Sequence, residues 1–501
     1  MGHGEAMDIL SNLALGFGVA ISAEALFFCF VGVTIGTFVG VLPGIGAVAA
    51  ISMALPLTFY MDPTIGLIML AGIFYGAQYG SSTAAILLNI PGTATAAVTC
   101  LDGYPMARQG RAGVALFVTT ITSFLGGSFA ILLLMSFAPI LAKFAIGFGS
   151  VEYFAIMVLG LVAASTIGIG SPVKGLTMVV FGVILGLVGT DVSTGVERYT
   201  FDFFHLHDGI SLVALAMGIF GISEVLASIG QNVPSMPKKL GLSNMLPTRD
   251  DVRRCGLPTV RGTLIGSAVG ILPGSGPSIA TFMSYAVEKR ISKEPERFGR
   301  GAVEGVASPE ASNNAAVQAA FIPTLSLGLP GDAVMAILLG AMLMHGIVPG
   351  PQFIGQNPEM FWGLIVSFWI GNVLLLILNL PLIGIWVRLL SIPYRILYPA
   401  MLFFICVGVY SVKNSMFDVY VAIVFGVVGY FMLLLRYPAA PLLLGFILGP
   451  LIEEHFRRAM LIGRGDFTVF VQSTISAVFL GVAALLLTAS AVRVYRMRAR
   501  S

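Results

Sequence analysis

The sequence predicts an all-α polytopic membrane protein of about 10–12 transmembrane helices, with two inverted-topology repeats, re-entrant helical hairpins and broken helices. Three observations predict this fold class. Apolar residues make up 57% of the 501 residues and charged residues only 10%, too few polar groups to cover a water-soluble globule. The pattern Leu-Pro-Gly-x-Gly interrupts strongly apolar sequence twice, at 42–46 and 272–276. Lysine and arginine are concentrated in a few segments.

The remaining composition argues against several classes of protein. The four cysteines are scattered singly, so neither a disulfide framework nor a zinc site is expected. The net charge of +3 is small and gives no indication of nucleic-acid binding. We expect no cleavable signal peptide, because no basic segment precedes the first apolar run. No Gly-x-x-x-x-Gly-Lys-[Ser/Thr] phosphate loop occurs, so ATP has no predicted site in this chain.

The first break separates two short apolar arms, 25–42 and 47–60. Neither arm comfortably reaches the roughly 20 residues that a helical span needs. The pair therefore predicts a re-entrant helical hairpin, although one long kinked span followed by a short helix fits the same pattern. Irregular backbone is tolerated at membrane depth only where it is buried in protein or lines a wet cavity.

A second broken segment follows from Met61. It contains the polar run 78–83 and breaks again at 90–93. The polar loop 102–113 then brings the first basic residues of the chain, Arg108 and Arg111. Four further spans with few polar interruptions are expected to form a scaffold, near 114–141, 150–170, 173–190 and 209–229.

The same pattern returns after a polar stretch. Residues 36–46 read GTFVGVLPGIG and residues 266–276 read GSAVGILPGSG, which indicates an internal repeat. Ser81-Ser82-Thr83 is aligned with Ser312-Asn313-Asn314, and 89–92 with 328–331, with eight extra residues between the two motifs in the second copy. The chain therefore divides into 1–230, a first repeat with scaffold helices; 231–261, a basic cytoplasmic linker; and 262–501, a second repeat with scaffold helices.

Charge placement predicts that the two copies have opposite topology. No lysine or arginine precedes Arg108, so the first hairpin has no basic flank. The second hairpin is flanked by the basic linker and by the basic segment 289–300, and none follows from 301 to 387. By the positive-inside rule the repeats are inverted. Further spans are expected near 361–387, 396–412, 416–435, 438–452 and 467–492, with a cytoplasmic C-terminus and a solvated loop or interfacial helix at 453–458.

The two breaks suggest one binding site. A helix that restarts after Pro-Gly presents free N–H groups and the positive end of its dipole, which attract a carboxylate without a buried lysine or arginine. The arm that stops presents carbonyls, which together with Ser, Thr and Asn oxygens can hold Na⁺. The predicted substrate-binding residues are Gly44, Gly46, Ser81, Ser82, Thr83, Gly92, Thr93, Gly274, Ser275, Gly276, Ser278, Asn313, Asn314 and Gly331. The predicted cation ligands are Pro43, Asn89, Pro273, Ser312, Thr324 and Asp332.

These polar residues also fit other interpretations. Small residues at the breaks can simply allow close helix packing, and Ser or Thr can bond its own helix backbone. Glu310 is either a buried proton or cation site or a residue that positions the second unwound segment. His205-Leu206-His207-Asp208 is expected in a solvated loop rather than at a metal. Glu152, Asp191 and Glu224 are expected at span ends rather than in the site.

Five motifs resemble one protein family, the large membrane subunit, TctA, of the bacterial tripartite tricarboxylate transporters. They are 40–44 (GVLPG), 79–92 (a run from Tyr79 through Asn89 to Gly92), 102–105 (DGYP), 309–314 (PEASNN) and 328–331 (GLPG), and the resemblance covers nearly the whole chain. It implies cation-coupled uptake, with Na⁺ and alternatively H⁺, of a carboxylate delivered by a periplasmic binding protein (TctC-like). It also implies a small membrane subunit (TctB-like) as partner, the bacterial inner membrane as location and no organic cofactor. Family members carry citrate, other di- or tricarboxylates, or aromatic acids.

We therefore expect a secondary transporter working by alternating access, preferably of elevator type, because re-entrant hairpins can gate either side. A channel that uses the same breaks as a selectivity filter is the second hypothesis. An intramembrane enzyme ranks last, because no histidine lies near either break in the sequence.

Overall fold

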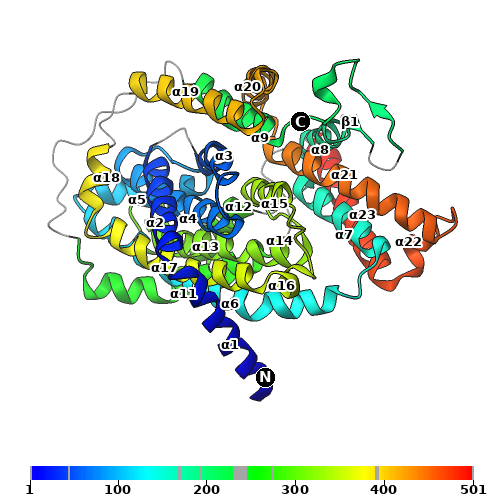
Figure 1. Ribbon diagram of the computed structural model, residues 1–501. Helices are drawn as coiled ribbons and strands as arrows, with labels where there is room; N and C mark the ends of the chain where they lie inside the picture. The colour runs from blue at the N-terminus through cyan, green and yellow to red at the C-terminus, as the bar shows by residue number, and fades with distance from the viewer. Residues whose placement is uncertain are drawn as a thin grey trace.

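The computed structural model describes residues 3–42, 46–166, 171–191, 194–228, 245–272, 276–389 and 394–498 (Figure 1). Within them the chain is helical apart from one short antiparallel strand pair, in which Gly189 faces Arg198. The elements are α1 (His3–Ala20), α2 (Ala23–Val41), α3 (Gly46–Thr58), α4 (Pro63–Leu88), η1 (Ala94–Ala96), α5 (Ala97–Arg108), α6 (Ala112–Ala145), α7 (Ser150–Thr166), α8 (Pro172–Gly186), β1 (Gly189–Thr190), β2 (Glu197–Arg198), η2 (Phe204–Leu206), α9 (Leu212–Ala216), the π-helix η3 (Met217–Ile222), α10 (Ser223–Ser228), α11 (Arg249–Gly270), α12 (Gly276–Ile291), η5 (Pro295–Arg297), α13 (Glu304–Ala319), α14 (Phe321–Leu327), α15 (Ala333–Met344), α16 (Phe353–Gln356), α17 (Pro358–Asn379), α18 (Ile383–Leu389), α19 (Tyr394–Lys413), α20 (Met416–Leu434), α21 (Ala439–Ile462), α22 (Val469–Gln472) and α23 (Thr474–Arg498).

Helix length and composition confirm a polytopic membrane protein. In the part of the chain that the structure describes, 6 helices are long and apolar enough to cross a bilayer: α2, α6, α17, α20, α21 and the stretch Thr474–Val492 of α23. Seven shorter apolar helices accompany them, among them α3, α7, α8 and α15. Short helices of this kind are expected where spans are broken or re-entrant.

Close glycine packing fixes the direction of the first repeat. Gly32, Gly36 and Gly40 of α2 lie so near the backbone of α4 that a Cβ atom would overlap a carbonyl oxygen. The facing carbonyls are, in order, those of Met69, Ile73 and Ala77. The residue numbers rise together, so α2 and α4 run in the same direction, and α3 between them must run back. The two arms of the predicted hairpin, α2 and α3, therefore run in opposite directions.

The second repeat is built in the same way. Three glycines of α11, also four residues apart, face carbonyl oxygens of α13; the pairs are Gly262 with Ser308, Gly266 with Ser312 and Gly270 with Ala316. α12 runs back along α11, because Glu288 near its end forms an ion pair with Arg261. In both repeats, glycine lets two parallel helices approach to backbone contact.

The two repeats run antiparallel to each other, as the charge pattern predicted. Ser82 of α4 donates a hydrogen bond to Glu310 of α13, whereas Gln78, one turn earlier, accepts one from Asn313, which comes later in α13. Since α2 and α4 are parallel, and α11 and α13 are parallel, this opposite order inverts the whole second repeat. The inverted topology therefore follows from contacts within the molecule.

The alignment of the repeats differs from the sequence prediction at one place. In the glycine packing, Ala77 of α4 takes the place that Ala316 of α13 takes in the second repeat, 239 residues later. The same difference of 239 separates Asn89 from Gly328, which end α4 and α14 in the left-handed conformation. The eight-residue insertion is therefore wrong, and Ser81-Ser82-Thr83 is not equivalent to Ser312-Asn313-Asn314. Eight residues are about two helical turns, so a short polar motif can shift that far and keep its face.

The linker boundary also moves. Residues 229–244 lie outside the described residues, but α11 begins at Arg249, so 249–261 belongs to the second repeat. A capping box starts this helix: the Asp251 N–H donates to the Thr248 hydroxyl, and the Thr248 N–H donates to the Asp251 carboxylate. The first turns of α11 are polar, which is why composition alone assigned them to the linker.

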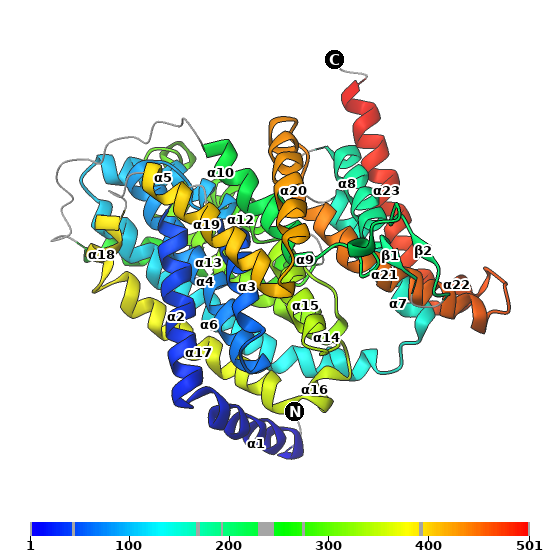
Figure 2. The same cartoon turned by 45° about the horizontal axis from the view of Figure 1, so that its top comes forward.

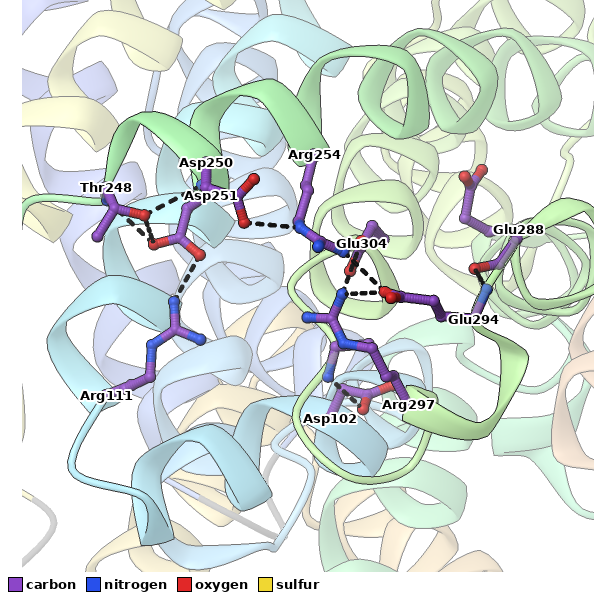
Figure 3. Close-up of polar contacts among 12 residues, drawn as sticks. Asp102, Arg111, Thr248, Asp250, Asp251, Arg254, Glu288, Glu294, Arg297 and Glu304 are labelled. Atoms are coloured by element: carbon purple, nitrogen blue, oxygen red, sulfur yellow. Dashed lines mark hydrogen bonds and ion pairs between the residues drawn. The ribbon is translucent and has the colours of Figure 1, made fainter.

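The charged segments around Arg111, the start of α11 and the turn before α13 lie together (Figure 3). Arg111 and Asp251, from different halves, form an ion pair of 2.6 Å. Asp102 joins the halves through backbone: its Oδ1 accepts from the N–H groups of Gly299, Gly301 and Ala302, each at 2.8 Å. Tyr285 donates to the other oxygen of Asp102 at 2.9 Å. One carboxylate thus holds the turn between α12 and α13 against α5.

The Arg111–Asp251 pair predicts an acid-dependent contribution to stability. Burial opposes ionisation of Asp251, but hydrogen bonds from Arg111 and Thr248 outweigh it and lower the pKa of this carboxyl. Because the pKa of Asp251 is lower in the folded state, the ionised carboxylate stabilises the folded protein at pH values above its ordinary pKa near 4. This stabilisation is lost as the pH falls through the pKa of Asp251 in the folded state. Asp251→Asn should cost about 1–2 kcal/mol of unfolding free energy at pH 7, with a smaller difference below pH 4.

Thermal unfolding of purified protein across pH 3–7 measures this effect. Asp250→Asn is the matched control, because Asp250 is 70% exposed and its pair with Arg254 is solvated. A pH-independent effect of Asp251→Asn would contradict the assignment.

Helices α7, α8, α21 and α23 lie together on one side of the molecule (Figures 1 and 2). α7, α8, α21 and α23 pack together, and glycines again set the spacing, with Gly182 and Gly186 of α8 against Leu442 and Phe446 of α21. α19 and α20 pack on η3. We call the set α7–α10 and α19–α23 the scaffold. The expected scaffold span 114–141 does not belong to it, because α6 packs on α13, with Gly126 against the Ala311 carbonyl.

Candidate functional site

A cavity of about 570 Å³ lies where the broken helices of both repeats meet the scaffold. The first repeat contributes Gly46 with its neighbours and Pro91–Thr95, and the second contributes Gly276–Ile279 and Gly331–Val334. The scaffold contributes the opposite wall: Ala164, Ser165, Ser171, Gly175, Phe220, Glu224, Pro438, Ala440, Pro441 and Leu444. The two breaks that were distant in sequence thus border one space.

Helix beginnings surround this cavity. α3 starts at Gly46 and α12 at Gly276, each with positive φ (67° and 61°), a conformation that glycine adopts without strain. α15 starts after Asp332, whose carboxylate accepts from the Met335 N–H at 2.8 Å. Thr93 precedes η1, which leads into α5. Among the described residues, no lysine or arginine lines the cavity, so the N–H groups and dipole ends of these helices are the groups there that attract an anion.

Gln78 connects the cavity wall to the interface between the repeats. Its Oε1 accepts hydrogen bonds from Thr95 at 2.8 Å, from the Asn313 amide at 3.3 Å and from Thr93 at 3.4 Å. The side chain is buried and also lines the cavity. Sequence reasoning missed Gln78 and Thr95 as site residues. The available signal for Gln78 was that it opens the polar run 78–83 inside an apolar segment.

A second polar cluster lies behind the wall, around Glu310. This residue is 1% exposed, and its carboxylate accepts from Ser82 at 2.8 Å, from Thr99, and from Ser123 at 3.3 Å. Asn314 donates to the Ser123 hydroxyl at 2.7 Å. These side chains come from α4, α5, α6 and α13, so both repeats build the cluster.

The predicted substrate-binding residues fall into three groups. Gly46, Gly92, Thr93, Gly276, Ser278 and Gly331 line the cavity. Ser81, Ser82, Thr83, Asn313 and Asn314 are buried outside the cavity lining; Ser81 accepts from Thr93, and Asn313 donates to Gln78. Gly44, Gly274 and Ser275 lie outside the described residues.

Of the predicted cation ligands that the structure describes, only Asp332 lines the cavity. Asn89 is exposed and ends α4 in the left-handed conformation, with φ of 58°. Thr324 donates to the Ala320 carbonyl of the preceding turn at 2.8 Å. Ser312 is buried against Gly266 of α11. Pro43 and Pro273 lie outside the described residues.

The other polar residues divide in a similar way. Glu224 lines the cavity, contrary to its expected place at a span end; it follows the π-helix η3, and π-bulges often occur at functional sites. Glu152 caps the start of α7 by accepting from the Gly149 N–H, and Asp191 pairs with Arg457. His205 and His207 lie in the turn-rich segment after β2, where His207 contacts Glu197. No group of three potential metal ligands (His, Cys, Asp or Glu) occurs among the described residues.

Inverted broken repeats around a cavity walled by helix beginnings define a class of protein, the multi-pass membrane transport proteins. Comparison with known proteins gives the family. The sequence profile of the tripartite tricarboxylate transporter TctA family matches residues 26–444, and this chain belongs to that family.

Two similar proteins come from Agrobacterium vitis. An uncharacterized 52.8 kDa protein in the TAR-I ttuC' 3' region is 52% identical over 476 residues, 95% of each chain. An uncharacterized protein in the TAR-II ttuC' 3' region is 57% identical over 216 residues, 43% of this chain and 89% of that one. No solved structure matches.

Proposed function

We propose that this chain is the large membrane subunit of a secondary transporter that takes up an organic carboxylate, coupled to Na⁺ or alternatively to H⁺. The observation that carries the proposal is the cavity at the two inverted breaks, where helix beginnings replace basic side chains. Such a site attracts a carboxylate without a permanent positive charge at membrane depth, which would be costly. Glu224 and Asp332 line the cavity from opposite walls, and their acidic side chains favour a cation bound together with the carboxylate.

Family membership supports the rest of the proposal. The partners are a small membrane subunit and a periplasmic binding protein that delivers the substrate, and the complex resides in the bacterial inner membrane with the C-terminus of this chain in the cytoplasm. The subunit binds and moves its substrate without a catalytic step.

The proposed movement is of elevator type. The two repeats are joined by buried hydrogen bonds, including Ser82 to Glu310, Asn313 to Gln78 and Tyr79 to Asn372. The wall that the scaffold contributes is largely apolar and small, with Ala164, Gly175 and Pro441. Hydrogen bonds hold the two repeats together, whereas few polar groups of the scaffold wall face them. This difference favours movement of both repeats together against the scaffold.

Counter-flow of radiolabelled carboxylates tests the transport proposal. The complex is reconstituted in proteoliposomes and assayed with and without Na⁺, at two pH values, and with and without the binding protein. Saturable, cation-dependent exchange that requires the binding protein is expected. Non-saturating flux that is independent of the binding protein would identify a channel and overturn the proposal.

A cysteine pair tests the movement. Gly340 of α15 packs directly against Leu212 of α9 in the scaffold. Gly340→Cys with Leu212→Cys should form a disulfide that abolishes uptake until reductant is added. Each single variant is the control. Full uptake by the crosslinked protein would contradict relative movement of α15 and α9.

A further inference from the structure

The Glu310 carboxylate is buried between the repeats and has no ion-pair partner among the described residues. The titratable side chains that face it are the Tyr79 phenol, which donates to Asn372, and the Cys100 thiol. Neither group is cationic. An ionised carboxylate in such a place costs several kcal/mol, so a buried carboxyl group is normally neutralised by a proton or a bound cation.

Oxygen atoms surround this carboxylate. The hydroxyls of Ser82, Thr99 and Ser123 all contact it directly, at 2.8 Å for Ser82 and 3.3 Å for Ser123. Asn314 holds Ser123 through its amide nitrogen, and its own Oδ1 is buried with no hydrogen-bond partner in the described structure. The Oδ1 of neighbouring Asn313 is also buried and unpartnered. Carboxylate, hydroxyl and amide oxygens are the ligands that hard cations such as calcium and magnesium prefer. Na⁺ is also a hard cation, so the same oxygen atoms suit it.

We propose that Glu310 is the binding site of the coupling cation, a proton or Na⁺, and that Ser82, Thr99, Ser123 and Asn314 complete it. The coupling of this cation to transport rests on the proposed function. The binding of the cation itself can be measured without a substrate. It differs from the cation site expected from the sequence, because Asp332 lies at the cavity wall and Glu310 lies behind it.

Gln78 links the Glu310 cluster with the cavity wall. Ser82, which donates to Glu310, also lies 3.5 Å from the Gln78 carbonyl oxygen. The Gln78 side chain accepts from Asn313, one turn beyond Glu310, and from Thr95 in the cavity wall. Movement of Ser82 or of α13 when Glu310 gains or loses a cation therefore reaches the wall through Gln78, and a carboxylate at the wall acts on the same residue. This shared network is the physical basis for coupling.

Thermal unfolding of the purified complex tests the site with Na⁺ and protons as the probes. Wild-type protein is titrated with NaCl at pH 8, with N-methylglucamine chloride holding ionic strength, and separately with acid in the absence of Na⁺. One of the two titrations should raise the unfolding temperature with a saturating midpoint, because a ligand that binds only the folded state stabilises it. The titration that responds identifies the cation.

Glu310→Gln should abolish that response and already unfold at the raised temperature, because the neutral amide needs no cation. Asp418→Asn is the matched control: it removes another buried carboxylate, in the scaffold helix α20, and should keep the wild-type response. A saturating response that survives in Glu310→Gln overturns the site, as does the absence of any response in wild type.

Ser123→Ala keeps the assay informative if Glu310→Gln does not fold. It retains the carboxylate and removes one oxygen, so the midpoint of the responding titration should shift at least about threefold. An unchanged midpoint counts against the site. Failure of counter-flow with a normal Glu310-dependent response would instead reject the proposed transport function.

Discussion

Gly266→Ala is expected to prevent folding or to cost about 3 kcal/mol or more of unfolding free energy. Its Cβ atom would overlap the backbone of Ser312, which cannot move away as a flexible side chain could. The displaced helix, α13, carries Glu310 and Asn313, so the polar interface between the repeats should be lost with it. The amount of monodisperse protein after size-exclusion chromatography and its unfolding temperature measure the effect.

Gly256→Ala on the same helix is the matched control. A Cβ atom at Gly256 would meet nothing within 4 Å, and alanine is a better helix former by about 0.8–1 kcal/mol. Gly256→Ala should therefore leave stability unchanged or raise it slightly. Equal behaviour of the two variants would show that backbone contact between α11 and α13 is not what holds the second repeat.

Gln78→Leu is expected to lower uptake by about 10–100-fold with the protein still folded. The substitution removes the acceptor that Thr95 and Asn313 share, and each unsatisfied buried donor costs about 1–3 kcal/mol. The cavity wall at Thr93–Thr95 should then lose its fixed geometry. Initial rates of uptake at several substrate concentrations separate weaker binding from slower movement.

Thr95→Val tests the same contact with a smaller change, and uptake should fall about 10-fold or less. Thr119→Val is its control, because the Thr119 hydroxyl bonds only the Leu116 carbonyl of its own helix at 2.9 Å and lies outside the cavity. If Thr95→Val and Thr119→Val reduce uptake equally, the hydrogen bond to Gln78 has no special role.

The features that sequence predicted best are those with a strong local cause. Pro-Gly in apolar sequence can only mark a broken helix that is buried or wet, and the breaks at Gly46 and Gly276 do border one cavity. Charge placement correctly predicted that Arg111 and the start of α11 share a face, because basic residues near spans select one side of the membrane.

Other features depend on contacts that no local pattern encodes. The correct alignment of the repeats is fixed by glycines of α11 against carbonyls of α13, whereas the polar triplets at 81–83 and 312–314 matched by composition alone. Gln78 and Glu224 reach the cavity because their helices present them there, and their residue types do not distinguish this place from a span end. The predicted ligands Asn89 and Thr324 satisfy helix ends and helix backbone instead.

The carboxylate of Asp102 has a consequence for how the chain is made. Its three backbone partners, Gly299, Gly301 and Ala302, are synthesised almost 200 residues after it. Gln78 and Ser82 likewise wait for α13. During synthesis, Asp102 therefore lacks its backbone partners and Ser82 lacks the Glu310 carboxylate until the second repeat is made. The final contacts of α4 and α5 with the second repeat thus form only after α13 has been made.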